Sequence, residues 1–129
     1  MKPAALAFEV MVPAQSMNMT DQVFQYAIKY LDRFSLSENV TTRLTHPAVH
    51  APRRTQELTE IIGDLEALGF DPVLTRAIRD VHKRLADLGT REALNATVPD
   101  DWRYALRVVA ELEERRAKGK QLERRHASG

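Results

Sequence analysis

The chain has 129 residues, of which 43% are hydrophobic and 29% are charged, proportions that are typical of one globular domain and too polar for a membrane protein. Because it contains no cysteine, disulfides, thiolate metal sites and a cysteine nucleophile are excluded. No apolar run approaches the roughly 20 residues of a membrane span, and the first residues do not resemble a signal peptide, so we expect a cytoplasmic protein.

The net charge of +1 is unevenly distributed along the chain. Residues 115–129 carry a net charge of +5, because Glu123 is their one acidic residue, and the other residues carry −4; the cations are Arg115, Arg116, Lys118, Lys120, Arg124 and Arg125. Cations suit the C-terminal end of a helix dipole. We therefore expect a single helical domain over residues 1–114, followed by a basic tail over 115–129 that is frayed or disordered. Such a tail could touch nucleic acid, but we do not expect a nucleic-acid partner.

The first half of the chain predicts helices separated by proline and serine. Residues from 3 onwards form an apolar helix that is interrupted or ended near Pro13. Thr20 is a credible N-cap for a second, amphipathic helix, and Ser37 can cap a short helix that runs to Leu44. Thr45-His46-Pro47 favours extended backbone, which predicts a joint at that point.

The second half contains the most regular pattern in the sequence. A central amphipathic helix is predicted over 52–68, with Gly69 at its end; its apolar residues are Leu58, Ile61, Ile62, Leu65 and Leu68. With Asp71 as N-cap and Pro72 at the first helical position, a second helix follows over 72–88 and pairs with the first as an antiparallel hairpin. One more turn is expected over 90–95, and a last helix opens at Pro99-Asp100-Asp101. The chain is thus predicted to be all-α, with five or six helices.

Few residues form patterns that carry chemistry. No glycine-rich phosphate loop is present, so we expect no bound nucleotide cofactor, and the four histidines lack the spacing of a zinc site. His50, Arg53, Arg54 and Glu57 gather an imidazole, two guanidinium groups and a carboxylate at the start of the central helix. They could hold an anionic substrate near that helix start. They could equally form an internal Arg–Glu pair that orients the helix.

The stretch H-A-P-R-R-T-Q-E-L-T-E-I-I-G-D-L-E-A-L-G-F-D-P resembles the C-terminal helical domain of the 6-phosphogluconate dehydrogenase-like, or β-hydroxyacid dehydrogenase-like, oxidoreductases. The closest branch is the one with a C-terminal domain of unknown function, DUF1932. The resemblance rests on His50, Ala51, Arg53, Arg54, Glu57, Glu60, Leu68, Gly69 and Pro72. It extends over roughly residues 44–89 and is fainter over 4–43.

This resemblance implies a helical domain that forms much of a dimer interface and one wall of an active-site cleft. In the family a Lys-Asp pair lies at the start of the equivalent helix. Arg54 and Glu57 are the matching candidates here, with His50 and Arg53 beside them. His50 and Glu57 are then candidate catalytic residues, and Arg53 and Arg54 candidate substrate-binding residues. The dinucleotide-binding domain and the first half of the interdomain helix, which carries the family's catalytic Lys, have no counterpart in this sequence.

Three functions follow as hypotheses. The chain is a substrate and dimerisation domain that cannot transfer a hydride alone; it meets NAD(P) through a separate nucleotide-binding subunit, or it is a fragment of a longer enzyme. Alternatively, it is a cofactor-independent lyase, isomerase or cyclase acting on an anionic or carbonyl small molecule. Or it is a non-catalytic dimerisation or adaptor module. A homodimer is expected, because a domain of this kind leaves apolar helix faces that require a partner.

Overall fold

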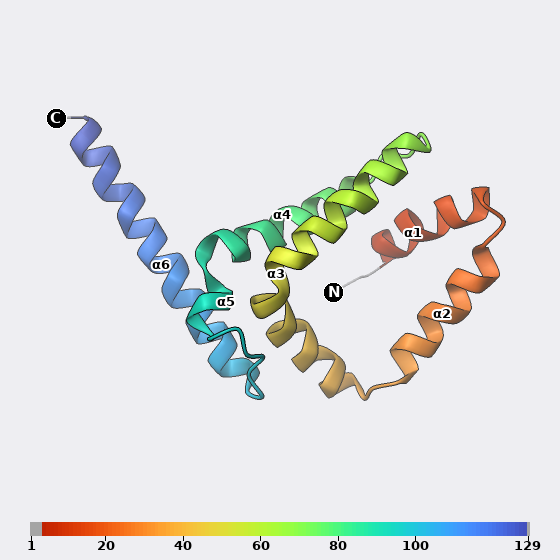
Figure 1. The fold of residues 1–129 in the computed structure, drawn as a ribbon, viewed down its shortest axis with the longest axis horizontal. Coiled ribbons are helices and arrows are strands. Elements are labelled where there is room, and N and C mark those ends of the chain that lie inside the picture. Colours follow the sequence, from red (N-terminus) through yellow and green to blue (C-terminus); the bar gives the residue numbers. More distant parts are fainter. Residues whose placement is uncertain (1–3, 129) are drawn as a thin grey trace.

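The computed structural model describes residues 4–128, with the side chains of 4–7, 30 and 31 excepted. Within this part of the chain it contains helices and no strand, as the sequence predicts. Figure 1 shows the arrangement of the six helices, which are α1 (Ala4–Ser16), α2 (Thr20–Asp32), α3 (Leu36–Ala67), α4 (Val73–Leu88), α5 (Thr90–Ala93) and α6 (Trp102–Ala127).

Helices α1 and α2 form an arm at the side of the molecule opposite to α6 (Figure 1). The predicted helix start at Pro3 lies outside the described residues. The helix does not end at Pro13 but continues to Ser16, because one proline removes a single amide donor from the ladder. Thr20 is the first residue of α2 rather than its N-cap, which is Met19. The Thr20 hydroxyl instead donates to Gln15 Oε1 at 2.8 Å, so it ties the two helices together.

The largest departure from the sequence prediction is α3. Its N-cap is Ser35, not Ser37, and Ser35 forms a capping box with Glu38: the Ser35 hydroxyl accepts from Glu38 N, and Glu38 Oε2 accepts from Ser35 N. The predicted joint at residues 45–47 and the predicted helix start at Pro52 are both wrong, since one helix runs through Pro47 and Pro52. Figure 1 shows that α3 changes direction partway along its length, as expected of a helix with internal prolines.

A hydroxyl from a distant segment satisfies the bond that Pro52 cannot make. Proline has no amide hydrogen, so the carbonyl of Ala48, four residues earlier, lacks its helical donor. The buried Thr90 hydroxyl lies 2.6 Å from this oxygen and donates to it. Arg91 Nη1 donates to the next carbonyl, Val49 O, at 3.2 Å. The proline break is therefore the place where α5 docks, and α3 continues through it.

The predicted hairpin of α3 and α4 is confirmed. Gly69 takes a φ of +86° just after α3, and Gly89 takes a φ of +74° at the end of α4. Residues other than glycine rarely adopt this left-handed conformation, so the two glycines end the two helices. Pro72 is the N-cap of α4 and Val73 its first residue, one position later than predicted.

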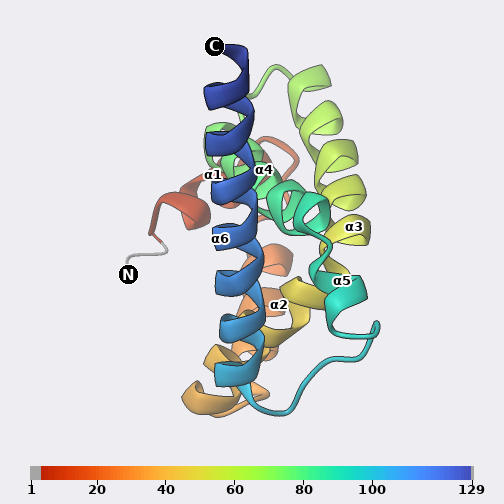
Figure 2. The same ribbon diagram turned by 90° about the vertical axis from the view of Figure 1, so that its left-hand side faces the viewer.

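The core lies where α5 and α6 pack on the middle of α3. Its buried members are Ala48, Val49 and Leu94, and the valines packed against them are Val98, Val108 and Val109. Asp101 caps α6 by accepting from Arg103 N at 2.9 Å, which agrees with the predicted start of the last helix. α6 then crosses one end of the molecule, from the bottom to the top of the view in Figure 2, and continues past Gly119 to Ala127. The segment expected to fray is thus helical where the structure describes it.

Candidate functional site

The residues singled out by the sequence lie together on α3, just after its bend. We call them the His50 cluster, together with two neighbours that the structure adds; its members are His46, His50, Arg53, Arg54, Glu57 and Arg91. Arg91 comes from α5 and is fixed by its hydrogen bond to Val49 O. Arg91 could not be identified from the sequence pattern, because a contact across 42 residues has no local signature.

Glu57 pairs with both arginines that precede it. Arg53 Nε lies 3.4 Å from Glu57 Oε1, and Arg54 Nη1 lies 3.5 Å from Glu57 Oε2. The side chains of Arg53, Arg54 and Glu57 are 65%, 50% and 44% exposed, so each pair contributes only about 0–1 kcal/mol to stability. One carboxylate offsets one of two guanidinium charges. With Arg91 nearby, the cluster remains cationic and can accept an anion.

His50 is one of three partly buried members of the cluster, with Glu57 and Arg91. Its pKa is lowered, first because burial disfavours the charged imidazolium and then because Arg53, His46, Arg91 and Arg54 repel it. The ring centroids of His46 and His50 are 5.7 Å apart. The imidazole of His50 is therefore held neutral at physiological pH, where one ring nitrogen can accept a proton or a hydrogen bond.

The described hollows lie elsewhere. A groove of about 390 Å³ runs between α4 and α6, where Lys83, Arg84 and Glu113 are among its lining residues. A second hollow of about 310 Å³ lies along α6 beside Ala93 and Tyr104. Neither is lined by the His50 cluster. The cluster thus occupies a partly exposed surface of α3.

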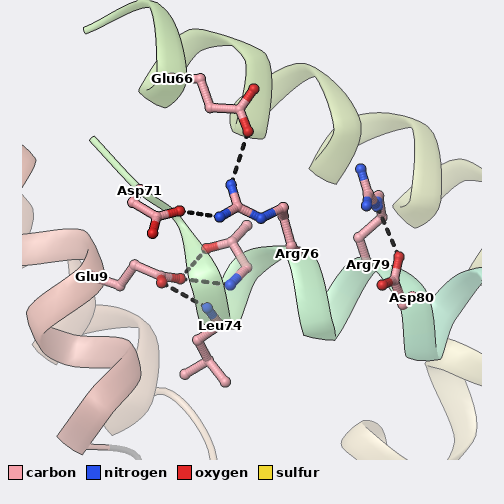
Figure 3. Close-up of polar contacts among 8 residues, drawn as sticks. Glu9, Glu66, Asp71, Leu74, Arg76, Arg79 and Asp80 are labelled. Atoms are coloured by element: carbon pink, nitrogen blue, oxygen red, sulfur yellow. Dashed lines mark hydrogen bonds and ion pairs between the residues drawn. The ribbon is translucent and has the colours of Figure 1, made fainter. Parts of the chain in front are cut away.

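A second polar cluster joins α1 to the start of α4, and the sequence pattern did not reveal it (Figure 3). Glu9 accepts from Leu74 N at 2.7 Å, from Thr75 N at 2.6 Å and from the Thr75 hydroxyl at 2.5 Å. Arg76 pairs with Glu66 of α3 and with Asp71. In the sequence, the one sign of this cluster was the carboxylate of Glu9 in an otherwise apolar predicted helix. That sign did not identify Leu74 and Thr75 as its hydrogen-bond donors.

The pKa of Glu9 reflects this geometry. Burial, the largest single influence, raises it, but the hydrogen bonds from Thr75 and Leu74 and the charge of Arg76 together outweigh burial. The pKa therefore lies below its usual value, and Glu9 is ionised at neutral pH. An anionic side chain at the exposed amides of a helix start is also favoured by the helix dipole. Glu9 therefore caps the start of α4, because Pro72 at the N-cap position has no side-chain acceptor for these amides.

Metal-binding groups and membrane-spanning helices bear on the class of site. No group of three or more His, Asp or Glu side chains is placed to hold a metal ion in this part of the chain. No helix among the described residues combines the length and the apolar character that a bilayer crossing requires.

Comparison with known proteins identifies one family. No curated protein and no solved structure matches the chain significantly. The family model described as a domain of unknown function, DUF1932, matches residues 14–85. This region extends from the end of α1 through α2 and α3 to most of α4, and it includes the bend of α3 and residues 50–57. The match covers more than half of the chain, and the chain therefore belongs to the DUF1932 family.

Proposed function

We propose that this chain is the substrate-side and dimerisation domain of a β-hydroxyacid dehydrogenase-like enzyme, with the nucleotide-binding part supplied by a separate subunit or by another part of a longer enzyme. The observation that carries the proposal is the cationic His50 cluster, in which Arg53 and Arg54 share one acidic partner, Glu57, next to a neutral imidazole and close to Arg91. Guanidinium groups bind carboxylates in a two-pronged way. A hydroxyacid carboxylate is the anion we propose for this surface, with Arg53 and Arg54 as its ligands.

The roles of the other two candidates follow from their charge states. A neutral His50 can accept the proton that leaves a substrate hydroxyl, whereas an imidazolium cannot. Glu57 holds Arg53 and Arg54 on one side of α3 and so orients them. In this proposal the chain makes no hydride transfer by itself, and NAD(P) is bound by the partner subunit.

Binding of a carboxylate probe tests the site. We expect 3-hydroxybutyrate, followed by nitrogen–proton NMR on the labelled full chain, to shift amide signals around residues 50–57 and near Arg91. Arg54→Ala should weaken this binding about tenfold, since one charge-assisted hydrogen bond contributes about 1.5–3 kcal/mol. Arg43→Ala is the matched control, because Arg43 is an exposed arginine on the same helix outside the cluster. Equal affinity of the Arg54→Ala variant and the wild type would refute the assignment.

The need for a second subunit has a separate test. NAD⁺ and NADP⁺ should produce no shifts in the isolated chain, and oxidation of 3-hydroxybutyrate should begin only when a nucleotide-binding subunit is added. Tight binding of either cofactor to the chain alone would refute the proposal.

The neutral His50 favours one alternative, a cofactor-independent lyase, isomerase or cyclase in which this imidazole is the base. Turnover by the chain alone distinguishes the two proposals. Turnover of a hydroxyacid or carbonyl substrate by the chain alone, abolished in Arg54→Ala, would favour the alternative.

The uncovered apolar face of α2 supports dimerisation. α2 packs chiefly on α1; Phe24 and Ile28 of α2 are 53% and 38% exposed, and Phe34, just after the helix, is 41% exposed. A second copy of the chain would remove this surface from water. By light scattering we expect a mass of twice 14.7 kDa for the wild type and a shift to monomer for Phe24→Glu. Tyr26→Glu is the control, because Tyr26 is 73% exposed and lies off the apolar stripe. A monomeric wild type would exclude this arrangement.

A further inference from the structure

The end of α6 carries a dense positive charge on an ordered helix. Between residues 115 and 128 there are six cations and a single acidic residue, Glu123. The structure describes this segment as helix through Ala127, and all of its residues except Gly119 are exposed. Figures 1 and 2 show that this end of α6 extends away from the arm and from the core. We call it the basic helix end; its cations are Arg115, Arg116, Lys118, Lys120, Arg124 and Arg125.

None of these six cations makes an ion pair with a described residue. In the rest of the described chain, ion pairs engage a different set of cations, namely Arg53, Arg54, Arg76, Arg79, Lys83 and Arg84. Arg116, Lys120 and Arg124 follow one another at intervals of four residues, so they form one row with a rise of about 6 Å between neighbours. Like charges at this spacing weaken an isolated helix by about 0.2–0.5 kcal/mol per pair.

The helix dipole accounts for only part of this charge. Its effect is confined to about the last turn, where Arg124, Arg125 and His126 lie. Arg115, Arg116, Lys118 and Lys120 lie further back and gain little from it. A polyanionic partner would neutralise the whole set.

The composition of the basic helix end indicates which class of polyanion it could bind. Between residues 115 and 128 its one large apolar side chain is Leu122, which is 56% exposed. Helices that lie on membranes need a continuous apolar face, and protein interfaces need apolar or aromatic anchors. Single-stranded nucleic acids are held by stacking on aromatic rings, and Phe, Tyr and Trp are absent from this stretch. Phosphates of a double helix require only positive charge, and the major groove admits an α-helix.

We propose that the basic helix end binds double-stranded nucleic acid through its phosphates, without sequence preference. The segment lies outside the residues matched by the family model, so this inference does not depend on the proposed dehydrogenase role. The cationic row of Arg116, Lys120 and Arg124 contacts successive phosphates, and the core end of α6 holds the helix in place through its packing on α3.

Fluorescence anisotropy with a labelled 20-base-pair DNA duplex and the full chain tests this proposal. We expect binding that weakens steeply between 50 and 200 mM salt. In the triple variant Arg116→Gln, Lys120→Gln, Arg124→Gln, the slope of log Kd against log salt should be less steep by about 2.7, or about 0.9 for each lost phosphate contact. The control triple Arg33→Gln, Arg43→Gln, Arg103→Gln removes the same charge from exposed arginines elsewhere and should keep the wild-type slope.

Three outcomes would overturn the proposal. The first is no binding of the duplex at 50 mM salt, and the second is an equal loss of slope in the two triple variants. The third is tighter binding to vesicles containing phosphatidylserine, or to a single strand of the same length, than to the duplex. Circular dichroism of both triple variants should show wild-type helix content, since every substituted residue is exposed.

Discussion

Replacement of Thr90 by valine should lower the free energy of unfolding by about 2 kcal/mol and the melting temperature by about 8 °C. Valine has the shape of threonine but no hydroxyl, so the Ala48 carbonyl would lose its donor at 2.6 Å. The same hydroxyl also lies 3.1 Å from Leu85 O. Thr90 is 0% exposed, and water therefore cannot replace the lost bond without opening the contact between α5 and α3. Thermal unfolding followed by circular dichroism measures the loss.

A double-mutant cycle with Pro52 isolates the cause of this loss. Alanine at position 52 restores an amide that can donate to Ala48 O within α3. Thr90→Val should then cost clearly less in the Pro52→Ala background than in the wild type. Thr97→Val is the control, because the Thr97 hydroxyl bonds to Asn95 O at an exposed site and its loss should change stability by less than about 0.5 kcal/mol. Equal costs in the two backgrounds would show that the bond from Thr90 to Ala48 O is not the source of the loss.

Replacement of Glu9 by glutamine should release α1 and α2 from the rest of the molecule while the hairpin of α3 and α4 stays folded. A carboxylate accepts from Leu74 N, Thr75 N and the Thr75 hydroxyl at once. A glutamine amide has one acceptor oxygen and would turn its NH₂ group towards a backbone donor. The expected cost is about 1–2 kcal/mol. Hydrogen exchange read by mass spectrometry should accelerate in α1 and α2 and change little in residues 55–67.

Acid should reproduce this release in the wild type. Because the folded pKa of Glu9 lies below its ordinary value, the stabilisation is fully present above that ordinary value. It is lost as the pH falls through the folded pKa. Exchange in α1 and α2, corrected for the intrinsic effect of pH, should therefore rise on acidification in the wild type and stay flat in Glu9→Gln. Glu114→Gln removes an exposed carboxylate of α6 and should behave as the wild type. A flat wild-type profile would contradict the role given to Glu9.

Release of the arm would also separate the two halves of the proposed function. The apolar face of α2 that we propose as the dimer contact lies on the arm, whereas the His50 cluster lies on α3. Because Glu9 docks α1 on α4, its replacement should disturb subunit association more than carboxylate binding. The same Glu9→Gln sample can be used for both measurements.

Local patterns in the sequence determined the all-helical class and the hairpin of α3 and α4. The apolar spacing of Leu58, Ile62 and Leu65 specifies a helix, and Gly69 and Gly89 supply the left-handed residues that end one. Both signals act within a few residues, so no knowledge of packing is needed to use them. The four candidate residues on α3 were brought together for the same reason, because residues three or four apart share a helix face.

The tertiary structure alone decided how α3 continues through Pro52 and how the cluster is completed. Local preference predicted a helix start at Pro52, but Thr90, 42 residues from Ala48, supplies a donor that lets the helix continue through Pro52. Glu9 likewise caps α4 from 65 residues away. The sequence shows where a proline or an uncapped helix end leaves a backbone group without its hydrogen-bond partner. It does not show which distant side chain supplies that partner, because this depends on how the chain packs.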